Sequence, residues 1–364
     1  MFGKKRTLKS SVIEKHHSYI MAVPKDESSI ATMDMVIERI KTSEVFEFVA
    51  IKNSEHPIVL FRYQQKEYEA EIFMESADIP EIYNINHRFI EEEFEALNKA
   101  QNGIMVSFLF GESAIVSFHM QIRLLQCLVP DILGIVDFSS MKIISGKWAM
   151  LAAKSEVPPS PEYLYSVHAV SGKNGEVWLH THGLNRCGLI ELEILGSHEK
   201  TYQTHYDVIK ALAEMGISKG ELVDEEEPKY VIDFGEDCLV ATWVDWSYAL
   251  SYAKKIKTGG KADRDDSHNG ETGVIFAYRS EKDYEKKKLS PITIYDDVLQ
   301  NNPLIMFTTE ETNRMKALAT ERFSFFEEHF QKDNEYTLDK SLLTDWIIYT
   351  EKETITPDSV YVLV

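Results

Sequence analysis

The hydrophobic and polar positions of the chain follow two periods, a short one typical of strands and a longer one typical of helices. Apolar runs bounded by turn residues predict strands at 19–23, 45–51, 58–63, 68–74, 104–110, 132–138 and 141–144. Apolar residues spaced by three and four predict helices at 30–40, 88–101 and 114–128. The last of these is apolar nearly all round, so we expect it in the interior. Two strand–helix–strand units, at about 19–51 and 104–138, therefore flank a meander of strands.

A proline-rich linker separates this part of the chain from the next. Pro158, Pro159 and Pro161 stiffen the backbone and exclude a helix there. Beyond the linker, the patterns predict a hairpin at 163–182 and strands at 188–195, 230–234, 239–244 and 273–278. They also predict helices at 203–215, 246–256 and 310–330, a mobile loop at 257–272, and apolar runs at 346–350 and 360–364. We expect Gly216 to stop the first of these helices.

These elements predict an α+β fold with mostly antiparallel sheets and helices packed on one face. A chain of 364 residues exceeds what one hydrophobic core usually holds, so we expect two or three domains. The expected parts are a flexible basic tail at 1–18, an N-terminal α+β domain at 19–156, a central α+β domain at 162–288 and a C-terminal helix-plus-strands segment at 289–364. We expect the C-terminal segment to pack on the central domain.

The balance of acidic and basic residues indicates which partners the protein can bind. Lys plus Arg is 39 and Asp plus Glu is 59, so the formal net charge is −20. An acidic surface repels phosphate backbones and anionic lipid. The charge therefore argues against nucleic-acid and membrane partners and favours a basic protein partner. The oligomeric state stays open.

Cysteine usage and the N-terminal residues indicate a cytoplasmic protein. Cys127, Cys187 and Cys238 lack C-x-x-C spacing, and an odd number of cysteines does not form a disulfide framework. The basic residues at the start are not followed by the apolar segment of a signal peptide. Apolar runs such as 104–110 are far shorter than the ~20 residues of a spanning helix.

The hairpin at 163–182 concentrates the chemistry of the chain. Its glycine-rich turn at 172–175 joins two strands whose side chains alternate between faces. If the apolar residues of both strands meet on the core side, odd-numbered positions pair with odd-numbered ones. That register places His168 beside His180 and His182 near Ser166. The sequence therefore predicts three imidazoles on one sheet face.

Three histidines on one sheet face can hold a zinc or iron ion and leave positions open for water or substrate. In that hypothesis Arg186 would bind an anion, and Glu191 or Glu193 would serve as an outer-shell group or general base. The alternative is that the imidazoles form polar surface on a half-exposed strand or a hydrogen-bonded structural cluster, and we prefer this structural or binding interpretation. We expect no cofactor, with zinc or iron at the three histidines as the exception.

The familiar catalytic and cofactor motifs are absent from the sequence. It has no G-x-G-x-x-G after a strand, no G-x-x-x-x-G-K-[ST], no G-x-S-x-G and no H-E-x-x-H. Residues from Asp265 onward begin like a calcium loop, but Phe276 stands where a glutamate is required. We interpret His119, within an apolar helix, as a buried histidine with hydrogen-bond partners, and Cys187 as an inert thiol.

A resemblance to a known family is carried by the segments 134–153, 163–170, 177–184 and 311–315. The most specific of them is the block H-T-H-G-L that begins at His180. With these segments the chain resembles a bacterial family called domain of unknown function 4026, over roughly 20–330. The resemblance implies an intracellular bacterial protein, and it carries over no activity and no site residue. The resemblance also implies that some relatives lie beside toxin-immunity or stress genes, which favours a protein-binding role.

These observations predict a non-enzymatic binding or adaptor protein, immunity-like or regulatory, with an acidic surface. The alternative is a metal-dependent hydrolase centred on His168, His180 and His182. A third option is a small-molecule sensor that uses the sheet face of Trp178. Whether the protein is an enzyme at all stays open at this point.

Overall fold

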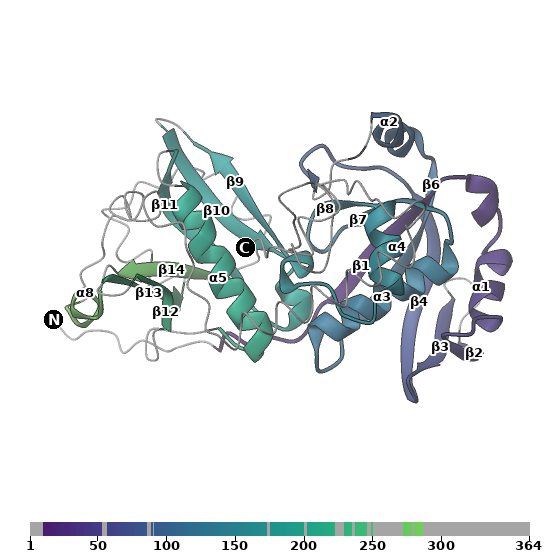
Figure 1. Cartoon of the computed structure of the whole chain (residues 1–364), viewed down its shortest axis with the longest axis horizontal. Helices are drawn as coiled ribbons and strands as arrows, with labels where there is room; N and C mark the ends of the chain where they lie inside the picture. Colours follow the sequence, from purple (N-terminus) through teal and green to yellow (C-terminus); the bar gives the residue numbers. More distant parts are fainter. Residues whose placement is uncertain are drawn as a thin grey trace, which may run out of the picture. The chain divides into compact units, whose positions relative to one another are not determined.

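The computed structural model describes residues 10–52, 57–85, 89, 91–172, 175–199, 202–222, 229–234, 237–245, 249, 272–278 and 280–286. They form two compact units (Figure 1). The first unit contains residues 17–160, and the second contains residues 10–16 together with the described residues from 161 onward. Both units combine helices with a large sheet, which confirms the predicted α+β class.

The first unit is built on an eight-stranded sheet in the order β2-β3-β4-β6-β1-β7-β8-β5. Its strands are β1 (His17–Pro24), β2 (Glu47–Ile51), β3 (Ile58–Tyr63), β4 (Lys66–Ser76), β5 (Asn84–Ile85), β6 (Asn102–Leu109), β7 (Ile132–Asp137) and β8 (Lys142–Ser145). All neighbours are antiparallel except β5 and β8. The predicted preference for antiparallel pairing is therefore confirmed in this unit.

Among the described residues of this unit, five helical segments accompany the sheet: η1 (Glu27–Ile30), α1 (Met33–Lys41), α2 (Glu91–Lys99), α3 (Ala114–Leu128) and α4 (Gly146–Lys154). The interior helix α3 has the predicted bounds, and the Ser113 side chain caps its start. It packs against α1 and α4. The ring of His119 lies 2.8 Å from the carbonyl oxygen of Ala152, which confirms that this histidine is a bonded interior residue.

Helix α4 was not predicted, although its apolar residues Trp148, Leu151 and Ala152 have helical spacing and are buried. Gly146 begins the helix at a point where the chain passes very close to β7. A Cβ atom on Gly146 would lie 1.9 Å from the carbonyl oxygen of Ile132, so a larger residue cannot be placed there without moving the backbone.

The second unit is built on a six-stranded sheet in the order β12-β13-β14-β11-β10-β9. Its strands are β9 (Ser166–Ser171), β10 (Glu176–His182), β11 (Glu191–His198), β12 (Lys229–Phe234), β13 (Asp237–Asp245) and β14 (Thr272–Tyr278). Among these described strands, β11 and β14 are the one parallel pair, and the other neighbours are antiparallel. Its helical segments are η2 (Pro161–Leu164), η4 (Asn185–Cys187), α5 (Tyr202–Lys219) and α8 (Glu281–Glu285).

Helix α5 lies against β9, β10 and β11 (Figure 1). The hydroxyl of Tyr165 donates to the carbonyl oxygen of Lys210 and to the carboxylate of Glu214, so the face of Tyr165 is the face toward α5. The prediction that Gly216 ends this helix is wrong, because α5 continues to Lys219. Gly216 instead allows close packing, since a Cβ atom there would lie 2.4 Å from the Leu222 side chain.

The residues just before β1 pair with the second unit. Val12 forms a β-bridge with Leu189, and the Ile13 amide donates to the carbonyl oxygen of Gly188 at 2.9 Å. The Ser11 hydroxyl accepts a hydrogen bond of 3.0 Å from the Leu222 amide. Residues 10–16, which fall within the expected tail at 1–18, are thus bonded to this unit, while residues 1–9 lie outside the described residues.

Several predicted elements lie outside the described residues. They are nearly all of the helix at 246–256, the loop at 257–271, the helix at 310–330, and the runs at 346–350 and 360–364. The C-terminal segment at 289–364 is outside as well. Among the helices that are described, none is both long enough and apolar enough to span a membrane.

Candidate metal site

The hairpin of β9 and β10 has the register that the sequence predicted. His180 pairs with His168, His182 pairs with Ser166, and the apolar Leu179 pairs with Ala169. The turn closes where the Gly172 amide donates to the carbonyl oxygen of Glu176 at 2.6 Å. The predicted pairing of odd with odd positions is confirmed, and it brings the histidines, which stand at even positions, to one face of the sheet.

The three histidines converge on a common space. Their candidate ligand nitrogens all lie within 4.8 Å of one another. The ring centroids of His182 lie 4.8 Å from those of both His168 and His180, and the remaining pair is 5.7 Å apart. His180 and His182 are only 4% and 8% exposed, and His168 on the edge strand β9 is half-buried. The cluster therefore differs from the half-exposed polar strand that the sequence left open.

Trp178 and Glu193 flank the cluster. The indole ring of Trp178 stacks on the imidazole of His180 with centroids 4.0 Å apart and planes inclined by 25°. Its Nε1 donates to Glu193 Oε2 at 2.9 Å. Glu193 is 1% exposed and is the cross-strand partner of His180 on β11, so both side chains point to the same face.

Glu191 shapes the turn that follows His182. Its carboxylate accepts hydrogen bonds from the Thr181 hydroxyl at 2.7 Å, the Gly183 amide at 2.8 Å and the Asn185 amide at 3.2 Å. Burial raises the pKa of this carboxyl, and the hydrogen bonds oppose that rise. Its described hydrogen bonds all come from nearby backbone amides and one hydroxyl group. The outer-shell or general-base role predicted for Glu191 stays a prediction.

Arg186 is fully buried and holds main-chain carbonyls. Its Nε donates to the carbonyl oxygen of Leu164 at 2.9 Å, and its Nη2 donates to the carbonyls of Leu164 at 2.6 Å and Tyr163 at 3.3 Å. The guanidinium thereby fixes the segment that leads into β9, the strand of His168. Anion binding by Arg186 stays a prediction, and the bonds that are described give it a structural task.

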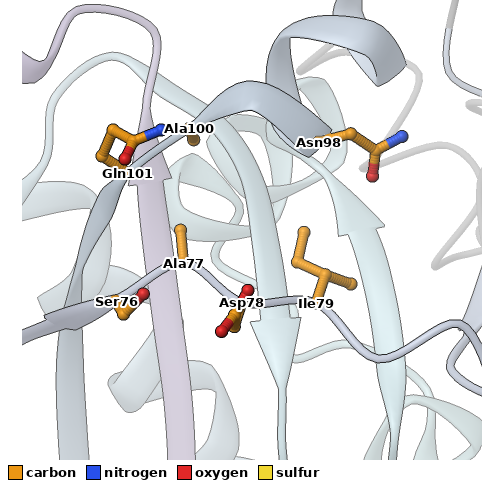
Figure 2. A pocket seen from close by; sticks show the side chains of 7 residues that line it. All are labelled: Ser76, Ala77, Asp78, Ile79, Asn98, Ala100 and Gln101. Carbon is orange, nitrogen blue, oxygen red and sulfur yellow. The ribbon is translucent and has the colours of Figure 1, made fainter.

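A hollow of about 230 Å³ lies elsewhere, in the first unit. Figure 2 shows the two segments that line it, one after β4 and one at the end of α2. Asp78 is the single charged residue among its lining residues. A lone exposed carboxylate among small, amide and isoleucine side chains offers no set of groups for catalysis or metal binding, so we place the candidate site at the histidines.

The histidine cluster fits a metal ion after a small adjustment. Two nitrogen ligands at 2.0–2.1 Å from a tetrahedral ion lie about 3.4 Å apart. The candidate nitrogens all lie within 4.8 Å of one another, so no pair has to approach by more than about 1.4 Å, which modest changes of side-chain torsions supply. Within the described part of the chain, the cluster consists of imidazoles alone.

Comparison with known families gives two adjoining matches. Residues 18–159 match the family described as protein of unknown function (DUF4026) N-terminal, and residues 167–276 match its C-terminal counterpart. No curated protein and no solved structure matches the chain. The boundary between the matches falls near the boundary between the two units, and the C-terminal match begins at the hairpin of the histidines.

Proposed function

This chain belongs to the DUF4026 family of proteins of unknown function, and we propose that it binds one divalent transition-metal ion through His168, His180 and His182. The observation that carries the proposal is the convergence of three imidazoles, with candidate nitrogens within 4.8 Å of one another, on one face of β9 and β10. Two of these rings are buried, which keeps bulk water from competing for the ion.

The donor set favours zinc over the other candidates. Neutral imidazole suits Zn²⁺, Cu²⁺, Ni²⁺ and Fe²⁺, whereas Mg²⁺ and Ca²⁺ need oxygen ligands. Iron sites of this size usually add a carboxylate to two histidines. Here the nearby carboxylate of Glu193 is hydrogen-bonded to Trp178, and three imidazoles with one open position suit tetrahedral zinc.

Metal binding is tested on protein prepared without a polyhistidine tag, because a tag would itself bind metal. Bound metal is removed from the protein with a chelator, and the protein is then dialysed against Zn²⁺. Its zinc content is measured by inductively coupled plasma mass spectrometry. We expect one zinc ion per chain in the native protein and none in the triple variant His168→Gln, His180→Gln, His182→Gln. Equal zinc contents in the native protein and this triple variant would contradict the proposal.

Hydrolysis is the alternative use of the same site. A zinc ion held by three nitrogens keeps a position for water and lowers the pKa of that water to about 7. Of the three accessory residues predicted from the sequence, Glu193 lies on the face of the histidines. Glu191 and Arg186 bond to turn and main-chain groups, so we assign any general-base role to Glu193 in preference to them.

A second candidate function is binding of a basic protein partner, as an adaptor or immunity-like protein. The net charge of −20 favours such a partner, and α2 concentrates acidic residues in its first turn, where Glu91 and Glu92 are exposed. These glutamates also complement the dipole of the helix, so their stabilising effect on α2 must be separated from their effect on binding.

The acidic surface is tested with a fluorescent lysine- and arginine-rich peptide as probe. We expect Glu91→Gln with Glu92→Gln to weaken binding, measured by anisotropy at low salt, by about fivefold, because close rim charges mainly steer association. The matched control is Glu44→Gln with Glu81→Gln, which removes the same charge from two other exposed positions. Equal losses in both double variants would show that only the net charge matters and would argue against α2 as a binding surface.

A further inference from the structure

Two successive contacts link β11 to one of the candidate ligands. Glu193 Oε2 accepts a hydrogen bond from Trp178 Nε1, and the Trp178 ring stacks on His180. All three side chains are at most 6% exposed. Water therefore does not compete for the indole N–H, and the stacked rings have little room to move.

The strand register explains why these residues meet. Glu193 is directly opposite His180, and the pairing of β10 with β11 shifts between Val177 and Leu179. Trp178 stands at this irregularity, two positions before His180 on the same face. From there its indole nitrogen reaches the carboxylate diagonally while its ring covers the imidazole.

Such a contact can fix the direction in which an imidazole presents its nitrogens. The His180 ring turns about two side-chain torsions, and the second of these is broad for histidine. A flat ring stacked 4.0 Å away restricts that rotation, provided that the indole is itself held. The hydrogen bond to Glu193 is what holds it.

We infer that Glu193 is a positioning residue that acts through Trp178 to hold the His180 ring in the orientation needed for metal binding. The inference rests on the metal site proposed above. It gives Glu193 the role of an outer-shell group, the kind of partner whose removal typically lowers metal affinity 10–100-fold.

Three variants separate this role from others. Glu193→Gln keeps an oxygen that can accept from the indole and removes the charge, whereas Glu193→Leu removes the acceptor. Trp178→Phe keeps an aromatic ring and removes the donor. We expect zinc affinity within about threefold of the native value for Glu193→Gln, and a loss of about 10–100-fold for Glu193→Leu and Trp178→Phe.

A second measurement uses the metal-free protein. Stacking on Trp178 should shift the carbon-bound ring protons of His180 upfield in the NMR spectrum. We expect Glu193→Gln to keep that shift and Glu193→Leu to reduce it. If the native protein binds no zinc, but Glu193→Gln keeps the upfield shift and Glu193→Leu reduces it, the proposed metal site is wrong. The conclusion that Glu193 positions the His180 ring through Trp178 is then still supported.

Two results would overturn the inference. One is a loss of affinity in Glu193→Gln as large as in Glu193→Leu, which would mean that the carboxylate acts through its charge or as a ligand. The other is an unchanged affinity and an unchanged His180 shift in Glu193→Leu. If Glu193→Leu does not fold, Glu193→Gln and Trp178→Phe decide the question, because only the second should weaken zinc binding.

Discussion

Replacing Arg186 by methionine is expected to destabilise the second unit by about 3–5 kcal/mol. The guanidinium is fully buried and donates to the carbonyl oxygens of Leu164 and Tyr163. Methionine fills a similar volume but leaves both carbonyls without these bonds, and each stranded buried acceptor costs about 1–3 kcal/mol. Lysine is not an adequate replacement, because it cannot reproduce the planar fork of donors.

The free energy of unfolding is measured by urea denaturation, with hydrogen exchange read separately on peptides from β9–β10 and from α3. The matched control is Arg62→Met, which removes an exposed arginine paired with Glu47 and Glu67 and should cost less than about 1 kcal/mol. A cost for Arg186→Met no larger than for Arg62→Met would mean that the buried bonds contribute little. A loss of protection confined to α3 would also contradict the expectation.

Replacing His180 by alanine is expected to weaken zinc binding by about 100-fold or more, since even outer-shell substitutions cost about 10–100-fold. His180 is the member of the cluster on which Trp178 stacks. It pairs across the hairpin with His168 and lies one alternation from His182. Its removal leaves two imidazoles, so the protein supplies two of the four ligands that a tetrahedral zinc ion needs.

Affinity is measured by competition with a chromophoric zinc chelator, again without a polyhistidine tag. His198→Ala is the matched control, because His198 ends the neighbouring strand β11 and lies outside the cluster. We expect this control to bind zinc within about twofold of the native protein. Similar losses in both variants would point to scattered surface histidines as the zinc ligands.

The sequence predicted elements best where a cap and a long apolar pattern coincide. Helix α3 has both, since Ser113 caps its start and its apolar residues continue to Leu128, and its bounds were predicted without error. Helix α5 shows the limit of local signals, because Gly216 resembles a stop but serves the packing of Leu222. The position of β1 between β6 and β7 depends on pairings between distant segments, which no local pattern specifies.

Some features of the candidate site also follow from local sequence, and others do not. Side-chain alternation and the turn at Gly172 were enough to predict that His168 and His180 would lie side by side, because a shift of one residue reverses the faces. The burial of the cluster could not be predicted, since it depends on what covers the sheet. The carbonyls that Arg186 binds lie more than twenty residues earlier, and nothing in the local sequence points to them.

The pairing of residues 11–13 with the second unit has a consequence for how the chain folds. Ser11 bonds to Leu222 across 211 positions, while all of the first unit lies between them. During synthesis, residues 11–13 emerge long before Leu222, so residues 17–160 can already have collapsed when their partners emerge from the ribosome. Completion of the second unit is thus a late step in folding. Removal of residues 11–13 should slow the folding of this unit, although most of its residues lie beyond residue 160.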